Sequence, residues 1–124
     1  PPREVAARVC GEPGLSDEDL LAQVERGGLS EGAWATVRGL VEALDPLRRR
    51  RLLQFCTGKA RIPYPGGLEP RLTVCFDRRL GGKLPQAAAC FHELRLPEGL
   101  PGEELAQRMR TALDETGDLD YWRA

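Results

Sequence analysis

Two short stretches in the second half of the chain decide the fold class: residues 71–76 read Arg-Leu-Thr-Val-Cys-Phe, and residues 90–96 read Cys-Phe-His-Glu-Leu-Arg-Leu. In the first stretch, Leu72, Val74 and Phe76 occupy every second position, and the second stretch alternates in a similar way. Alternation with a period of two is typical of a strand that buries one face. We therefore predict β-strands over residues 71–76 and 90–96.

Helical patterns surround these two stretches. Ser16, Ser30 and Asp45 are good N-cap residues, and glycine follows the first and third of the segments that they begin. The predicted helices cover residues 17–26, 31–44, 46–55 and 102–115. Because helices and strands do not alternate regularly, the pattern predicts an α+β fold, a small two-layer domain with several helices packed on a short β-sheet.

The size and composition of the chain indicate one globular domain. It has 124 residues, of which 41% are apolar and 30% charged. No run approaches the roughly 18 apolar residues of a membrane span, and no basic start followed by an apolar block marks a signal peptide. The chain begins with Pro-Pro rather than Met, so we expect a fragment of a longer protein. We predict a cytoplasmic location, with the nucleus as the alternative, and no membrane partner.

The formal net charge of -1 hides an uneven distribution. Residues 1–45 carry 4 basic and 9 acidic side chains, residues 46–95 carry 11 and 3, and residues 96–124 carry 3 and 7. The near-zero total argues against a general nucleic-acid binder, and we predict no nucleic-acid partner. Two explanations of the basic middle segment stay open: the outer segments neutralise it in the fold, or it surrounds a site that needs a positive potential.

Four consecutive arginines, Arg48 to Arg51, lie in the third predicted helix. Such a run resembles a localisation signal or a nucleic-acid patch. Four consecutive residues project all around a helix, however, so they cannot all face one partner. We therefore predict that these side chains form a solvated surface.

The four cysteines of the chain are Cys10, Cys56, Cys75 and Cys90, and no two of them are separated by only two residues. The chain has a single histidine, His92. Zinc sites need clustered ligands, so we predict no metal site. Without a secretory signal we expect all four cysteines to be thiols. Cys56 and Cys75 lie in apolar stretches and are expected in the core, and Cys10 at the periphery.

Cys90 follows three small residues, Ala87, Ala88 and Ala89. Small side chains before a thiol leave room for a large partner to approach. In an extended strand, His92 would lie on the same face as Cys90, where it could stabilise the thiolate or move a proton. Cys90 is therefore a candidate nucleophile with His92 as a supporting residue, and a buried structural thiol is the alternative.

Four short segments of the chain, in residues 52–58, 61–63, 83–91 and 94–97, together resemble the C-terminal lobe of HECT-type ubiquitin ligases. Residues 83–91, Lys-Leu-Pro-Gln-Ala-Ala-Ala-Cys-Phe, and residues 94–97, Leu-Arg-Leu-Pro, resemble the active-site pattern E-K-L-P-x-A-x-T-C-F-x-x-L-x-L-P of that family. Upstream, residues 52–58, Leu-Leu-Gln-Phe-Cys-Thr-Gly, and residues 61–63, Arg-Ile-Pro, resemble its L-L-Q-F-V-T-G and R-x-P. The segments occur in the order of the family over roughly residues 40–120.

This resemblance implies a function and a division of the chain. Residues 40–124 would form the C-terminal lobe (C-lobe), and residues 1–39 a helical lead-in from an N-terminal lobe (N-lobe) that the chain lacks. Cys90 would accept ubiquitin as a thioester from a charged conjugating enzyme and pass it to a substrate lysine. The implied partners are ubiquitin, a conjugating enzyme that the N-lobe recruits, and a protein substrate. No metal or diffusible cofactor is implied.

Three positions depart from the family pattern. Ala89 stands where Thr is usual, Ala88 where a polar residue is common, and Tyr121 where the family has a catalytic Phe near its end. Tyr121 is therefore a second supporting candidate, and a catalytically weakened lobe that binds ubiquitin or a partner is the alternative function. A thiol-redox domain lacks a resolving cysteine near Cys90 in the sequence. A purely structural helical adaptor leaves the Cys90 motif unexplained.

Overall fold

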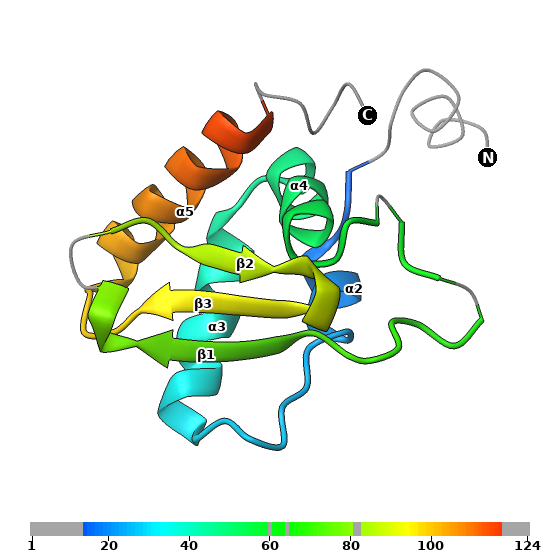
Figure 1. The fold of residues 1–124 in the computed structure, drawn as a ribbon, viewed down its shortest axis with the longest axis horizontal. Helices are drawn as coiled ribbons and strands as arrows, with labels where there is room; N and C mark the ends of the chain where they lie inside the picture. Colours follow the sequence, from blue (N-terminus) through cyan, green and yellow to red (C-terminus); the bar gives the residue numbers. More distant parts are fainter. Residues whose placement is uncertain (1–13, 60, 64, 81–82, 118–124) are drawn as a thin grey trace.

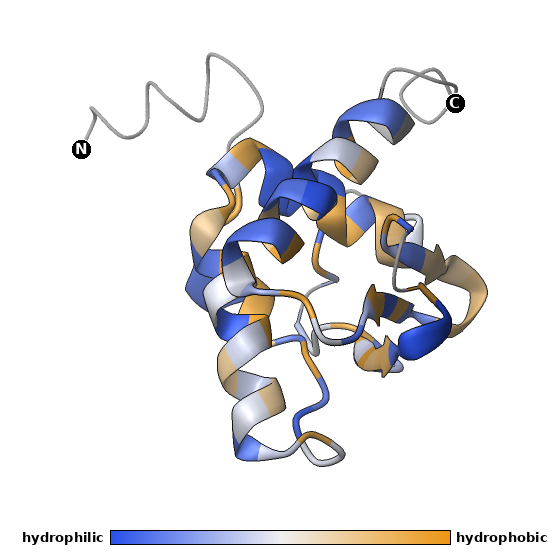
Figure 2. Cartoon of the chain, turned by 90° about the vertical axis from the view of Figure 1, so that its left-hand side faces the viewer, coloured by the Kyte–Doolittle hydropathy of each residue, from blue (hydrophilic) through white to orange (hydrophobic). Residues whose placement is uncertain are grey.

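A computed structural model describes residues 14–59, 61–63, 65–80 and 83–117 (Figure 1). Within these residues, helices cover one face of a three-stranded mixed sheet. In Figure 2 the helices and the strands lie on opposite sides of the molecule. The predicted α+β class with two layers is therefore confirmed.

The sheet consists of β1 (Thr73–Asp77), β2 (Gln86–Ala88) and β3 (Glu93–Pro97), in the order β1-β3-β2. β3 runs parallel to β1 and antiparallel to β2. The strand predicted over residues 71–76 is confirmed as β1, with its ends shifted by one or two residues. The sequence does not predict β2, because Gln-Ala-Ala contains no β-branched or aromatic side chain.

The strands β2 and β3 form a hairpin that is closed by residues 89–92. The loop begins with the 3-10 turn η2 (Ala89–Phe91), and His92 follows in the left-handed conformation, with φ 52° and ψ 51°. The predicted strand over residues 90–96 is therefore wrong at its start, because these residues must reverse the chain between two antiparallel strands. Four-residue loops are a common hairpin connection. Cys90 thus lies at the tip of the β2–β3 hairpin.

The two faces of the sheet differ in burial. Val74, Leu94 and Leu96 are buried against the helices. Cys75 alternates onto the opposite face, where it is only half-buried. The prediction that Cys75 lies in the core is wrong, because its neighbours Val74 and Phe76 take the inward positions of the strand.

Four helices are described: α2 (Asp17–Leu21), α3 (Glu31–Ala43), α4 (Pro46–Thr57) and α5 (Gly102–Gly117). The three predicted N-caps are confirmed, because the side chains of Ser16, Ser30 and Asp45 each accept a hydrogen bond from the N–H three residues ahead. Gly58 follows α4 in the left-handed conformation, with φ 76°. The helix therefore stops where glycine permits this backbone conformation.

The helix α2 is shorter than the predicted helix over residues 17–26. Beyond it, Val24 forms an isolated parallel bridge with Leu72. The N–H of Glu25 donates to the carbonyl oxygen of Leu72 (2.7 Å), and the N–H of Leu72 donates to that of Gln23 (2.9 Å). The helix ends early because these backbone groups pair with the segment that enters β1.

One hydrophobic core lies between the helices and the sheet. Its buried residues are Leu20, Val24, Val37, Leu40, Val41, Leu44, Leu52, Leu53, Cys56, Leu68, Leu72, Val74, Leu94, Leu96, Leu105, Ala106, Met109, Ala112 and Leu113. The predicted core position of Cys56 is confirmed. The helix α3 runs through positions 39 and 40, and Val37 and Leu40 both belong to this core. The division between a lead-in and a C-lobe at this point stays a prediction about the longer protein.

Candidate active site

The thiol of Cys90 is accessible at the tip of the β2–β3 hairpin. Cys90 is exposed, and the side chain of Phe91 beside it is 71% exposed. Ala87 and Ala88 belong to β2 and Ala89 begins η2, so only small side chains lead up to the thiol. The alternative of a buried structural thiol is therefore wrong for Cys90. The thiol at this hairpin tip is therefore open to solvent.

The other two described cysteines are less accessible than Cys90. Cys56 is fully buried in α4, and this burial raises the pKa of its thiol. Burial, followed by a hydrogen bond from its Sγ to Oε2 of Glu93 (3.3 Å), raises the pKa of Cys75. Because the thiolate is the reactive form, both shifts lower reactivity. All three are free thiols, as predicted, and Cys10 lies outside the described residues.

The side chain of His92 is directed into the protein rather than along a strand face shared with Cys90. His92 is only 6% exposed, and its Nδ1 lies 2.6 Å from the carbonyl oxygen of Pro70. The expected common face is wrong, because a 3-10 turn lacks the two-residue period of a strand. The described partner of the imidazole is thus the backbone of the segment before β1.

Two further contacts hold the segment that leads into the hairpin and the loop at its tip. Arg108 in α5 donates from Nη1 to the carbonyl oxygen of Lys83, ahead of β2 (3.0 Å), and from Nη2 to Glu104 (2.8 Å). The N–H of Thr73 in β1 donates to the carbonyl oxygen of His92 (2.9 Å). Sequence reasoning missed both contacts, because a backbone carbonyl accepts a hydrogen bond whatever its side chain is.

The helix α4 lies next to β2 and contacts β2, η2 and β3 (Figure 1). Residues 52–58 form the second half of α4 and its cap, and residues 83–97 form the hairpin with the segment that leads into it. The fold therefore brings together two of the segments that resemble HECT motifs, although they are far apart in the sequence.

The four arginines of α4 are half-buried, so the predicted solvated surface is wrong. Arg48 donates to Asp114 of α5 through Nε (3.0 Å) and Nη2 (2.7 Å), and to Asp45 through Nη1 (2.9 Å). Arg49 donates from Nε to the carbonyl oxygen of Val41 (2.9 Å). Arg48 and Arg49 thus bond to the neighbouring helices α5 and α3. The acidic segments thus neutralise part of the basic segment, which favours the first explanation of the charge pattern.

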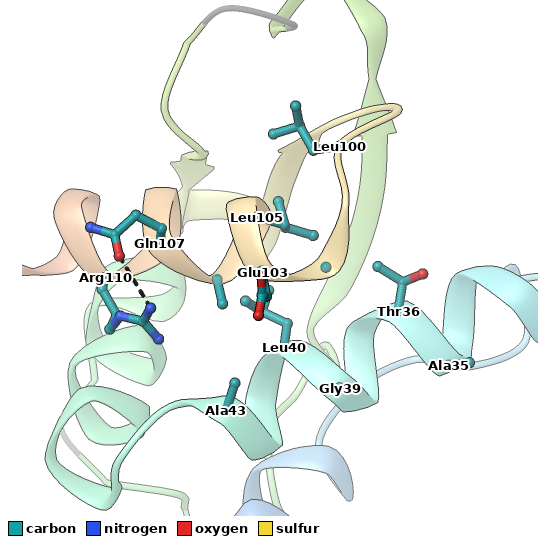
Figure 3. A pocket seen from close by; sticks show the side chains of 12 residues that line it. Ala35, Thr36, Gly39, Leu40, Ala43, Leu100, Glu103, Leu105, Gln107 and Arg110 are labelled. Carbon is teal, nitrogen blue, oxygen red and sulfur yellow. Dashed lines mark hydrogen bonds between the residues drawn. The ribbon is translucent and has the colours of Figure 1, made fainter.

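A separate groove of about 600 Å³ lies between α3 and α5 (Figure 3). Thr36 and Leu40 line its α3 side, and Leu105 and Arg110 line its α5 side. None of its lining residues belongs to β2, η2 or β3. The groove is therefore distinct from the Cys90 site.

Three further predictions concern metal binding, membrane spans and Tyr121. Among the residues that the structure describes, no three His, Cys, Asp or Glu side chains converge as metal ligands would. None of the helices described above is long and apolar enough to cross a membrane. Tyr121 lies outside the described residues, so its supporting role stays a prediction.

Comparison with known proteins identifies the family. The HECT-domain (ubiquitin-transferase) family model matches residues 1–120. The chain belongs to this HECT-domain family. The resemblance seen in residues 52–58 and 83–97 is thereby confirmed, and ubiquitin transfer is the activity of the family.

Curated HECT-type relatives align along nearly the whole chain. It is 36% identical to E3 ubiquitin-protein ligase hecd-1 of Caenorhabditis elegans and 34% identical to E3 ubiquitin-protein ligase Ufd4 of Drosophila melanogaster, each over 94% of the chain. It is 37% identical to E3 ubiquitin-protein ligase RSP5 of Chaetomium thermophilum over 92% of the chain. The chain spans only 5%, 4% and 15% of the lengths of these relatives.

Proposed function

We propose that Cys90 carries ubiquitin as a thioester and passes it to a substrate lysine. The observation that carries this proposal is the exposed thiol at the tip of the β2–β3 hairpin, within the stretch that resembles the HECT active site. Membership of the HECT-domain family supports ubiquitin transfer in general. The burial of Cys56 and the half-burial of Cys75 leave Cys90 as the accessible nucleophile among the described cysteines.

The chemistry consists of two acyl transfers. The thiolate of Cys90 attacks the carbonyl carbon of the thioester that joins ubiquitin to the conjugating enzyme, and the sulfur of that enzyme leaves as a thiolate. The amine of a substrate lysine then attacks the new thioester, forms an amide bond, loses a proton and expels the Cys90 thiolate. No oxidant, metal or diffusible cofactor is needed for either step.

The remaining parts of the proposal concern the longer protein. Residues 40–124 act as the C-lobe, residues 1–39 lead in from an N-lobe, and the N-lobe recruits the conjugating enzyme. Tyr121 supports the transfer from the end of the chain. The protein acts in the cytoplasm, with the nucleus as the alternative, on a protein substrate.

The decisive experiment supplies the full-length protein with a conjugating enzyme charged with labelled ubiquitin. Wild type should form a ubiquitin adduct that a thiol reductant removes, and Cys90→Ala should form none. Cys75→Ala is the matched control and should behave as wild type, because it removes a thiol that the hairpin does not carry. A wild type without the adduct, or equal adduct formation by Cys90→Ala, would show that the proposal is wrong.

A weakened lobe that binds ubiquitin without efficient transfer is the second candidate function. The observation that favours it is the start of η2, where Ala88 occupies the N-cap position and provides no side-chain hydrogen bond. Ala89 likewise offers no hydroxyl beside Cys90. Under this alternative, the full-length protein binds free ubiquitin but forms the adduct slowly, and Ala89→Thr accelerates adduct formation. If Ala89→Thr leaves the rate unchanged, the missing hydroxyl does not limit transfer.

A further inference from the structure

The loop that presents Cys90 depends on one residue for several of its hydrogen bonds. The N–H of His92 donates to the carbonyl oxygen of Ala89 (3.2 Å) across the turn, and the N–H of Thr73 in β1 donates to the carbonyl oxygen of His92 (2.9 Å). At the other end of the turn, Ala88 provides no side-chain cap. The backbone of His92 thus links the hairpin loop to β1.

The backbone of His92 also sets the path of the loop. Its φ of 52° lies in the left-handed region, which few non-glycine residues adopt. Histidine and asparagine are among the side chains that tolerate this region best, whereas most others disfavour it. The reversal of the chain between Cys90 and β3 therefore places a requirement on the residue at position 92.

The imidazole of His92 connects this loop to a fixed part of the fold. A carbonyl oxygen can only accept, so Nδ1 carries a proton and donates it to the carbonyl oxygen of Pro70 across 2.6 Å. Gln23 holds that segment on either side of Pro70: its Oε1 accepts from the N–H of Leu68 (2.8 Å), and its carbonyl oxygen accepts from the N–H of Leu72 (2.9 Å). The imidazole therefore anchors the hairpin to a segment that has its own support.

We infer that His92 is a positioning residue for transfer: its Nδ1–H bond to Pro70 holds the hairpin loop in the conformation that presents the Cys90 thiol. This inference rests on the proposed function of Cys90. His92 acts through the backbone of the loop, and its ring neither takes a proton from the thiol nor gives one to the leaving group. The atom that matters is Nδ1, which faces the Pro70 carbonyl.

A series of substitutions separates anchoring from acid–base chemistry. In His92→Asn, the amide nitrogen takes the place of Nδ1, and asparagine tolerates the left-handed backbone. This variant keeps the anchor and has no titratable ring. His92→Gln instead carries its amide near the position of Nε2, and His92→Gly keeps the backbone freedom without any side-chain donor. Of these three variants, only His92→Asn should keep the anchor to Pro70.

The experiment measures the rate of single-turnover transfer from a charged conjugating enzyme to Cys90 in the full-length protein. The rate is measured from pH 6 to 9 over a range of concentrations of the charged conjugating enzyme. Loss of one hydrogen bond should slow the first-order step about tenfold in His92→Gln and His92→Gly, with an unchanged half-saturating concentration. His92→Asn should stay within about twofold of wild type, with the same pH profile. Hydrogen exchange of the peptide that spans residues 86–97, followed by mass spectrometry, should increase in His92→Gly and stay unchanged in His92→Asn.

Three outcomes would overturn the inference. If His92→Asn is as slow as His92→Gln, or its pH profile differs from that of wild type, the ring itself takes part in proton transfer. If every variant transfers at the wild-type rate, the anchor does not matter for transfer. If the wild type forms no adduct, the proposed function is wrong. The hydrogen exchange of residues 86–97 then tests by itself whether His92 anchors the loop. Equal exchange in wild type and His92→Gly would exclude the anchor.

Discussion

Removal of the ion pair between Arg48 and Asp114 tests whether the arginines of α4 stabilise the fold. The two side chains are joined by two hydrogen bonds and are 30% and 42% exposed. Partly exposed pairs contribute about 0.2–1 kcal/mol to stability. We place this pair near the top of that range because its two hydrogen bonds are parallel, and because Arg48 has a second carboxylate partner in Asp45. We therefore expect a coupling energy of about 1 kcal/mol.

The assay is a double-mutant cycle in which Arg48→Ala, Asp114→Ala and the double variant are unfolded with urea. The coupling should fall to less than half in 1 M salt, because the Debye length shrinks from about 10 Å at 0.1 M to about 3 Å. The matched control is the pair Arg38–Glu42 on α3, which is 4.0 Å long with both side chains more than half exposed. Its coupling should be about 0.3 kcal/mol or less.

The same cycle has a defined pH dependence. The hydrogen bond from Arg48 lowers the pKa of Asp114. The folded-state pKa thus lies below the unfolded value of about 3.9. The contribution of the pair is fully present above that value and is lost as the pH falls through the folded-state pKa. A coupling below about 0.3 kcal/mol at pH 7 and low salt, or one that survives 1 M salt unchanged, would refute the assignment of a stabilising pair.

Three other outcomes are expected. With a thiol reagent under native conditions, Cys90 should react first and Cys56 only on global unfolding, as followed by mass spectrometry; equal rates would contradict the burial of Cys56. Gly58→Ala should lower the free energy of unfolding by about 1 kcal/mol, because its φ is 76°, and an unchanged melting temperature would contradict this. Leu53→Ala should lower the free energy of unfolding by about 3 kcal/mol because Leu53 is fully buried, whereas Phe91→Ala should change it by less than about 0.5 kcal/mol because Phe91 is exposed. Denaturation curves of the two variants that coincide would contradict this difference in burial.

The elements that the sequence predicts well are those whose ends are set by local chemistry. The helices α3 and α4 begin after Ser30 and Asp45, whose side chains accept from the first turn, and α4 ends at Gly58. Each of these signals involves residues within four positions of one another, so it can be found without knowledge of the fold.

The elements that the sequence predicts poorly depend on distant partners. The helix predicted over residues 17–26 ends early because Val24 pairs with Leu72, which no local pattern reveals. The strand predicted over residues 90–96 begins late because β2, which has no strand-like composition, requires a turn at residues 89–92.

Some features of the candidate site could likewise be predicted from the sequence, and others could not. The motif around Cys90 predicts a nucleophile, and the structure adds that this thiol is exposed. The orientation of His92 could not be predicted, because its partner Pro70 is 22 positions away and contributes a backbone oxygen rather than a side chain. The half-burial of Arg48 could not be predicted either, because its partner Asp114 is 66 positions away in the sequence.

The bond between His92 and Pro70 limits how far the hairpin is a self-contained module. A peptide of residues 83–97 includes the whole stretch that resembles the HECT active site, and its four-residue loop closes at little entropic cost. Such a peptide, or a graft of it onto another scaffold, lacks the acceptor at Pro70 and the support from Gln23. A transplant that reproduces the presentation of Cys90 therefore has to carry residues from three separate parts of the chain.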